Sequence, residues 1–281
     1  GANGSGKTTL MRVIAGEQEY DAGEITREKG TQVSYLPQSG ILYSSNTLFD
    51  EVDKAYEKYH LVESRKQTIE KTMHESSPQG EELDTLIHEQ HALQEQLLAS
   101  GFYERHHEKE EILTGLGFSK EDFERSCSSF SGGWQMRIAL AKILLERPHI
   151  LLLDEPTNYL DLEARGWLED FLVQYHGGVL IVSHDRYFLD TVVERVYELC
   201  MGNLKKYEGN YSVYEKKHNE AMELLQKKYE EQQKEIEKTE EFIQRFRYNA
   251  SKAQQVQSRI KMLEKQERIV LPPTLKNVRL S

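Results

Sequence analysis

The sequence predicts an α/β domain followed by an antiparallel α-helical hairpin. Two short apolar runs, residues 150–153 and 179–182, are bounded by turn residues, as expected of buried parallel strands. Amphipathic stretches with helical spacing alternate with them, which is typical of a sheet covered by helices. A glycine-rich phosphate-binding motif opens the chain, and residues 211–270 carry a broken heptad pattern.

The elements of the α/β part follow from hydrophobic spacing and turn residues. Residues 46–126 are polar and helix-prone, with apolar side chains at helical spacing. A Lys29-Gly30 turn separates two short strand-like segments. In chain order the pattern predicts a helix at 8–15, strands at 24–26 and 32–36, helices within 46–126, a helix at 134–145, and strands at 150–153 and 179–182.

Residues 211–270 predict the hairpin. Apolar residues recur at alternating spacings of three and four from Met222 to Phe246, and the pattern returns at Ala253 after a polar break. Two heptad segments separated in this way indicate helices that fold back on each other, with the tip at residues 247–252. Arms of roughly 25–30 residues would each be about 40 Å long. A single continuous helix is the alternative.

The charge of the chain is divided unevenly. The 281 residues carry a formal net charge of −11, from 47 acidic and 36 basic side chains. Residues 1–215 hold 21 basic and 37 acidic groups, whereas residues 216–281 hold 15 basic and 10 acidic ones. A basic projection on an acidic body can bind a polyanion, and a solvated helix face is the alternative. Five basic residues and no acidic one lie between positions 242 and 263: Arg245, Arg247, Lys252, Arg259 and Lys261.

Composition also limits the classes of protein to which the chain can belong. Cys127 and Cys200 are the two cysteines, which favours a reducing compartment over a disulfide scaffold. No apolar run approaches the roughly 18 residues that a membrane span needs, and no secretory signal is visible. We therefore expect a cytoplasmic protein with no membrane partner. A phosphate loop normally follows a strand, and Pro272-Pro273 precedes a strand-like end, so we expect a piece of a longer protein.

Residues 1–8 satisfy the phosphate-loop pattern G-x-x-x-x-G-K-[ST] in full. The glycines let successive backbone N–H groups point at phosphate oxygens, and the following helix directs its positive end at the same anion. Lys7 is expected to reach the β- and γ-phosphates, and the Thr8 hydroxyl to bind Mg²⁺. The predicted phosphate-binding residues are Gly1, Asn3, Gly4, Ser5, Gly6, Lys7, Thr8 and Thr9.

An apolar run at 150–153 ends in two acids, Asp154 and Glu155. Ionised carboxylates at the end of a buried strand are costly unless a cation or hydrogen bonds compensate them. Beside a phosphate loop, Asp154 is placed to hold Mg²⁺ and Glu155 to orient or deprotonate an attacking water. Two solvated acids at a strand exit would be the alternative for an isolated pair.

Further motifs follow in a fixed order, and together the residues resemble the nucleotide-binding cassette of ABC ATPases, a P-loop NTPase fold with a helical subdomain at about 46–146. The resemblance covers roughly residues 1–210. Its motifs are Leu36-Pro37-Gln38 for the Q-loop, Ser131-Gly132-Gly133-Trp134-Gln135 for the signature, Asp154-Glu155-Pro156-Thr157-Asn158-Tyr159-Leu160-Asp161 for Walker B and the D-loop, and Val182-Ser183-His184-Asp185-Arg186 for the H-loop. Phe130 precedes the signature where leucine is more usual.

The resemblance implies the roles of these residues. Gln38 would bridge Mg²⁺ and the attacking water, and His184 would contact the γ-phosphate of its own site. Residues 131–133 start a helix and would bind the γ-phosphate held by an opposite cassette. Asp161 would communicate across the interface between two cassettes. The catalytic set is therefore Glu155, His184 and Gln38, and the metal set is Thr8, Gln38 and Asp154.

Within this family the chain resembles the ABC-F branch, which has two cassettes in one chain. The hairpin that directly follows the cassette carries the resemblance, as does Tyr207-Glu208-Gly209-Asn210-Tyr211 before it. It implies a first cassette at 1–210 without its N-terminal strands, a linker at 211–270 and the start of a second cassette at 271–281. Such linkers reach toward the peptidyl-transferase centre and P-site tRNA of the ribosome. The implied contacts to RNA are Arg245, Arg247, Tyr248, Lys252, Arg259 and Lys261.

The resulting expectation is an ATPase that acts on the ribosome, as a translation factor, with ATP and Mg²⁺ as ligands. Each ATP would lie between two cassettes, and the adenine-stacking aromatic would precede Gly1, so we expect this piece alone to be weakly active or inactive. One alternative is the cytoplasmic ATPase subunit of an ABC transporter, which leaves the basic hairpin unexplained. A coiled-coil DNA-repair ATPase would carry a long insertion between Thr8 and Ser131. A non-enzymatic RNA-binding module would not need Glu155 and His184.

Overall fold

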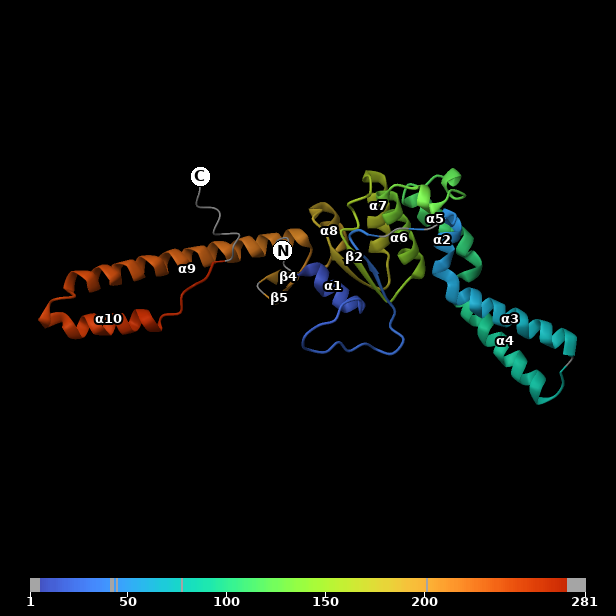
Figure 1. Ribbon diagram of the computed structural model, residues 1–281, viewed down its shortest axis with the longest axis horizontal. Helices are drawn as coiled ribbons and strands as arrows, with labels where there is room; N and C mark the ends of the chain where they lie inside the picture. Colours follow the sequence, from blue (N-terminus) through green and yellow to red (C-terminus); the bar gives the residue numbers. More distant parts are fainter. Residues whose placement is uncertain (1–5, 41–42, 44, 77, 201, 272–281) are drawn as a thin grey trace. The chain divides into compact units, whose positions relative to one another are not determined.

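The computed structural model describes residues 6–271 except 41–42, 44, 77 and 201 (Figure 1). The chain divides into two compact units, Gly1–Asn210 and Tyr211–Ser281. The predicted phosphate contacts of Gly1, Asn3, Gly4 and Ser5 lie outside the described residues, as does nearly all of the segment expected to start a second cassette.

A parallel three-stranded sheet forms the centre of the first unit. Its strands are β1 (Val33–Leu36), β2 (Ile150–Asp154) and β3 (Gly178–Val182), in the order β1-β2-β3. In this register Leu36 lies opposite Leu153, and Asp154 lies opposite Val182. The carboxyl ends of all three strands therefore meet at one edge, and the residues that follow them are brought together.

The strands predicted at 32–36, 150–153 and 179–182 are confirmed. The strand predicted at 24–26 is wrong, because residues 23–28 have no regular secondary structure and are exposed. Within the described part of the chain no strand pairs with this segment, so its backbone groups have no ladder to join.

Helix α1 (Lys7–Ala15) packs on the sheet through Met11, which is buried against Tyr35 and Leu152. Gly6 caps the start of this helix in the left-handed conformation, with φ of 88°. This backbone region favours glycine, so the second glycine of the phosphate-loop pattern is required by the turn itself.

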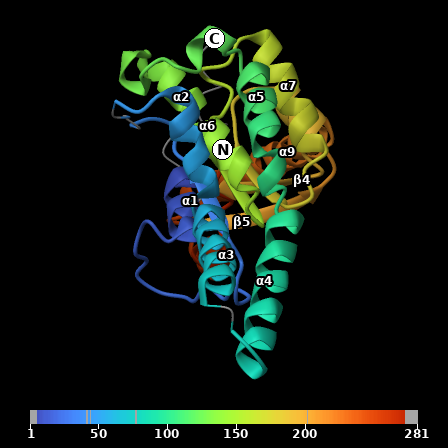
Figure 2. The ribbon, with the colours of Figure 1, turned by 90° about the vertical axis from the view of Figure 1, so that its right-hand side faces the viewer.

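The helical region between β1 and β2 contains most of the hydrophobic core. Helices α3 and α4 pack side by side as a hairpin (Figures 1 and 2). Helix α6 is buried along most of its length, and Ile138 and Leu140 join the core that also includes Leu151 and Leu153 of β2. The helices are α2 (Leu48–Asp53), α3 (Glu57–Ser76), α4 (Glu81–Ala99), α5 (Arg105–Gly115) and α6 (Gly132–Glu146), with short 3-10 turns at Lys54–Tyr56, Phe102–Glu104, Lys120–Asp122 and Cys127–Ser129.

Two more helices and a β-hairpin complete the first unit. Helix α7 (Leu162–Val173) follows β2, and helix α8 (Arg186–Val192) follows β3. Each begins at an aspartate whose side chain accepts a hydrogen bond from the first turn. Strands β4 (Arg195–Cys200) and β5 (Asn203–Glu208) then pair in antiparallel fashion.

The second unit is a helical hairpin of unequal arms. Helix α9 (Tyr211–Phe246) has 36 residues and α10 (Ala253–Lys265) has 13, with a 3-10 turn at Ala250–Lys252 between them. The predicted hairpin and the position of its tip are confirmed, but the expected length of roughly 25–30 residues for each arm is wrong, because α9 is longer and α10 is shorter. After α10 the chain continues without helix beside α9, where the amide of Gln232 bonds the backbone of Glu267 and Ile269, each at 2.9 Å.

A buried carboxylate joins α2 to α6. The side chain of Glu51 is 3% exposed and accepts hydrogen bonds from Lys142 (2.7 Å), Lys54 (2.6 Å) and Asn46 (2.9 Å). Burial alone would raise the pKa of Glu51, but these donors outweigh it and leave the pKa below its usual value. The charge is therefore retained inside the helical region.

This network predicts a pH-dependent loss of stability. Because the folded-state pKa of Glu51 is lowered, its contribution is present above the unfolded pKa of about 4.3 and is lost as the pH falls through the folded value. We expect Glu51→Gln to cost about 1–3 kcal/mol of unfolding free energy at pH 7 and less at pH 4, from urea midpoints at both pH values. Glu82→Gln, at an exposed position on α4, should change neither midpoint. An equal loss at both pH values would contradict the ionised network.

Candidate nucleotide-binding site

The phosphate loop and β2 meet through one short hydrogen bond. The Thr8 hydroxyl donates to Oδ2 of Asp154 at 2.7 Å, although the two residues are 146 positions apart. Asp154 ends β2 and is 2% exposed, and the Tyr35 hydroxyl lies 3.5 Å from the same oxygen. Two of the three predicted metal ligands, Thr8 and Asp154, therefore lie side by side at the carboxyl edge of the sheet.

These donors suit a magnesium ion that is delivered with a polyphosphate. No group of three His, Cys, Asp or Glu side chains within the described ranges could hold a metal by itself. Mg²⁺ prefers oxygen ligands and is commonly held by one or two protein groups together with phosphates and water. A hydroxyl and a carboxylate in contact fit that arrangement. Gln38 follows β1 at the same edge and is exposed to solvent.

The proposed catalytic pair is also brought together. Glu155 is 6% exposed, and its Oε1 lies 3.5 Å from Nε2 of His184. The backbone N–H of His184 donates to Glu155 Oε2 at 3.2 Å. Glu155 has φ of 54°, and its own N–H bonds the carbonyl of Val182 at 2.7 Å. A non-glycine residue in this region costs about 1–3 kcal/mol, which is typical of functional sites.

The signature residues begin helix α6. Ser131 precedes the helix in an extended conformation, and Ser131 and Gly132 are exposed. The first-turn N–H groups of this helix are therefore available to an anion. Phe130 is buried and makes an edge contact with Phe118 and a tilted contact with Trp134, with ring centroids 5.6 and 6.4 Å away, so the aromatic side chain at this position serves packing.

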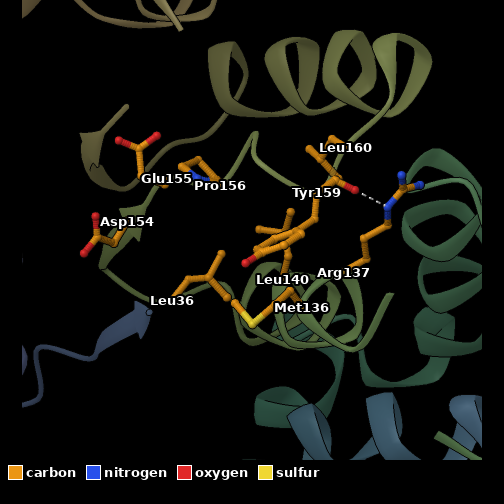
Figure 3. Close-up of a pocket in the computed structure, with 9 residues that line it drawn as sticks. All are labelled: Leu36, Met136, Arg137, Leu140, Asp154, Glu155, Pro156, Tyr159 and Leu160. Carbon is orange, nitrogen blue, oxygen red and sulfur yellow. Dashed lines mark hydrogen bonds between the residues drawn. The ribbon is translucent and has the colours of Figure 1, made fainter. Parts of the chain in front are cut away.

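One residue that sequence patterns missed, Arg137, lies beside the D-loop. It donates to the carbonyl of Tyr159 at 2.7 Å (Figure 3). It also donates to Oδ2 of Asp161 at 2.9 Å. The N–H of Ala164 donates to the other Asp161 oxygen, and this bond first, then Arg137, lowers the pKa of Asp161 against the opposing effect of burial. The sequence signal that could have identified Arg137 was an arginine on the buried face of α6, because arginine is seldom buried without a partner.

Comparisons with known proteins identify the family of this chain. A sequence profile described as ABC transporter matches residues 1–158, and a second profile with that description matches residues 197–280. ABC transporter F family member 5 of Arabidopsis thaliana is 35% identical over 283 residues, covering 100% of this chain and 41% of the relative. The chain belongs to the ABC-F family of ATP-binding cassette proteins.

Bacterial relatives show the same partial coverage. YdiF of Bacillus subtilis is 40% identical over 267 residues, which cover 95% of this chain and 41% of YdiF. The uncharacterized ABC transporter ATP-binding protein YfmM of the same organism is 35% identical over 271 residues, which cover 96% and 52%. The chain thus spans about two fifths to one half of the relatives it matches.

A solved structure supports the ABC cassette fold. The ATP-binding subunit of an ABC transporter superposes with a TM-score of 0.53 at 20% identity, covering 74% of this chain and 75% of the other. None of the helices in the described part of the ABC-F chain combines the length and apolar character needed to cross a bilayer.

The cations at the hairpin tip fall into two groups. Lys252 Nζ lies 4.0 Å from the ring centroid of Phe246, and the Arg259 guanidinium lies 4.1 Å from that of Phe242. These two cations are packed on aromatic rings and help to hold the tip together. Tyr248 is 94% exposed, and Arg247 and Lys261 are exposed as well. Arg245 is also exposed, but its guanidinium lies 5.9 Å from the ring centroid of Phe246.

The contact between Thr8 and Asp154 predicts how the cassette responds to magnesium. In the full-length protein, Asp154→Asn should reduce the Mg²⁺-dependent gain in ATP affinity at least about tenfold. Changing a residue that only hydrogen-bonds a metal ligand already costs about tenfold or more in metal affinity, so changing a ligand itself should cost at least as much. Titration of a fluorescent ATP analogue, with Mg²⁺ and with EDTA, measures this gain. Asp170→Asn, at an exposed position on α7, is the control and should retain it. A full gain in Asp154→Asn would rule out the assignment.

Proposed function

We propose that the full-length parent of this chain binds and hydrolyses Mg-ATP in the cytoplasm, on the ribosome, as a translation factor, and that this piece alone is weakly active or inactive. The observation that carries ATP binding and hydrolysis is the meeting of Thr8, Asp154, Glu155 and His184 at one edge of the sheet. The role on the ribosome is supported by the basic tip of the hairpin and by membership of the ABC-F family.

The arrangement supports hydrolysis by positioning and charge. Lys7 and the phosphate loop would hold the triphosphate, and Thr8, Asp154 and Gln38 would hold Mg²⁺, which neutralises charge on the β- and γ-phosphates when bound. Glu155 would take a proton from the attacking water, whose oxygen bonds to the γ-phosphorus as the bond to the β-phosphate oxygen breaks. The products are ADP and inorganic phosphate. His184 is placed to contact the γ-phosphate.

A second cassette belongs to this proposal. The exposed first turn of α6 at Ser131 and Gly132 would bind the γ-phosphate held by the other cassette of the same full-length chain, and Asp161 would lie at the interface between them. Closure of the two cassettes around ATP would then fix the position of the linker. Hydrolysis would open the cassettes and release the ribosome.

The proposed partner of the hairpin is ribosomal nucleic acid, both rRNA and P-site tRNA. Arg245, Arg247 and Lys261 are exposed cations suited to phosphates, and Tyr248 offers an exposed ring for stacking on a base. The ring-packed Lys252 and Arg259 would contribute charge from fixed positions.

Slowed hydrolysis should trap the full-length protein on ribosomes. Glu155→Gln, together with the same change in the second cassette, removes the proton acceptor but keeps the shape of the site. We expect ATP, but not ADP, to drive this variant into the ribosome pellet on co-sedimentation. Glu163→Gln, at an exposed position on α7, is the control and should pellet no more than the natural protein. A trapped variant that stays off ribosomes and copurifies with a membrane protein would favour a transporter subunit instead.

The two groups of tip cations should behave differently. Arg247→Gln with Lys261→Gln should weaken ribosome binding and lower its salt dependence by about one to two counterions, with unchanged helix stability and ATP affinity. Lys252→Gln with Arg259→Gln should in addition lower the melting temperature of the hairpin, because each cation-ring contact contributes about 0.5–1 kcal/mol. Binding across a salt series and circular dichroism melting measure both. Equal melting losses in the two pairs would contradict the division.

A further inference from the structure

A buried arginine joins three segments behind the signature. Arg137 lies on α6, is 8% exposed, and uses its guanidinium nitrogens on three acceptors. Nε donates to the Tyr159 carbonyl at 2.7 Å, Nη1 to the Leu116 carbonyl at 2.9 Å and Nη2 to Asp161 at 2.9 Å. The guanidinium carbon lies 4.3 Å from the ring centroid of Trp134, so three hydrogen bonds and one ring contact fix the position of this group.

Two glycines lie where a larger residue would crowd the side chains of this junction. A Cβ atom at Gly117, where φ is +92°, would lie 2.8 Å from Arg137 Nη1. A Cβ atom at Gly133 would lie 3.1 Å from Cδ1 of Tyr159. The first turn of α6 and the D-loop are therefore in direct contact as well as hydrogen-bonded through Arg137, and a shift of one must displace the other.

The other end of the same short segment is Glu155. Residues 155–161 form tight turns in which the N–H of Asn158 bonds the Glu155 carbonyl and that of Leu160 bonds the Thr157 carbonyl, both at 3.2 Å. The Thr157 hydroxyl also lies 3.5 Å from that of Ser183, next to His184. Figure 3 shows Arg137, Tyr159 and Glu155 along this path from α6 to the end of β2.

We propose that Arg137 is a positioning residue that transmits the position of the signature helix to the carboxylate of Glu155. The inference rests on the proposed ATPase function and deepens it. An anion bound at Ser131 and Gly132 would set the geometry of Glu155 through Arg137 and the D-loop. In a protein with two cassettes, the γ-phosphate held at the signature would thus regulate hydrolysis at the other site.

The test uses the full-length protein with Arg137→Gln and a matched control. Arg105→Gln is suitable because Arg105 also donates to a carbonyl (Phe102, 2.8 Å), lies over a ring (Phe102, 3.9 Å) and faces a carboxylate (Asp53, 3.7 Å), but on α5. We expect Arg137→Gln to lower kcat at least about tenfold, with KM for ATP changed less than about threefold. Hydrogen exchange at residues 158–160 should become faster without nucleotide. Arg105→Gln should show neither effect.

A second variant separates positioning from folding. Asp161→Asn retains an N-cap for α7 but loses the ion pair with Arg137. It should lower kcat in the same direction as Arg137→Gln, and the double variant should be no slower than Arg137→Gln alone. Arg137→Lys, which keeps the charge, should restore part of kcat.

The possible outcomes separate a failure of this inference from a failure of the proposed ATPase function. If the natural protein does not hydrolyse ATP, both the proposed function and the inference are overturned. If it does, but Arg137→Gln matches Arg105→Gln in kcat and in exchange at 158–160, only the inference is overturned. Independent, multiplicative losses in the double variant would also overturn it.

Discussion

The hydrogen bond between the Thr8 hydroxyl and Asp154 is the contact on which the site depends, and it exists because the sheet is parallel. In the register of β1, β2 and β3, the three strands end at one edge. Asp154 ends β2, Gln38 and His184 follow β1 and β3, and the start of α1 meets the same edge through Thr8. A polar site thus forms at the edge of a hydrophobic core that includes Leu151 and Leu153 of β2.

Much of this arrangement could be predicted from the sequence because its parts are short and local. A phosphate loop needs glycine at a left-handed turn, and Gly6 adopts that turn; apolar runs that end in acids or in Ser-His predicted β2 and β3 correctly. Arg137 could not be found in this way, since its importance comes from a contact with Tyr159, which is 22 positions away in the sequence. The strand predicted at 24–26 had the right local pattern but no partner within the described residues. Heptad spacing located the hairpin tip but not the length of α10, which ends before β-branched residues and Pro272.

Charge has separate uses in the two compact units. In the first, buried ions are held by opposite partners, as Glu51 is by Lys142, and they connect helices around the signature. In the second, Lys252 and Arg259 pack on aromatic rings while Arg247 and Lys261 are exposed to solvent. Counting basic residues identified the tip as a candidate nucleic-acid contact. Only the structure separates the cations that hold the tip from those available to a partner.

The central claim is that one chain holds Mg-ATP at the carboxyl edge of its sheet while its basic tip contacts ribosomal nucleic acid. The most direct measurement is a cryo-EM map of the full-length protein on ribosomes, with hydrolysis blocked. The account predicts density for Mg²⁺ against Thr8 and Asp154, a γ-phosphate near Glu155 and His184, and RNA within contact distance of Arg245, Arg247 and Tyr248. A map with an empty phosphate loop, or with the tip against protein alone, would contradict it.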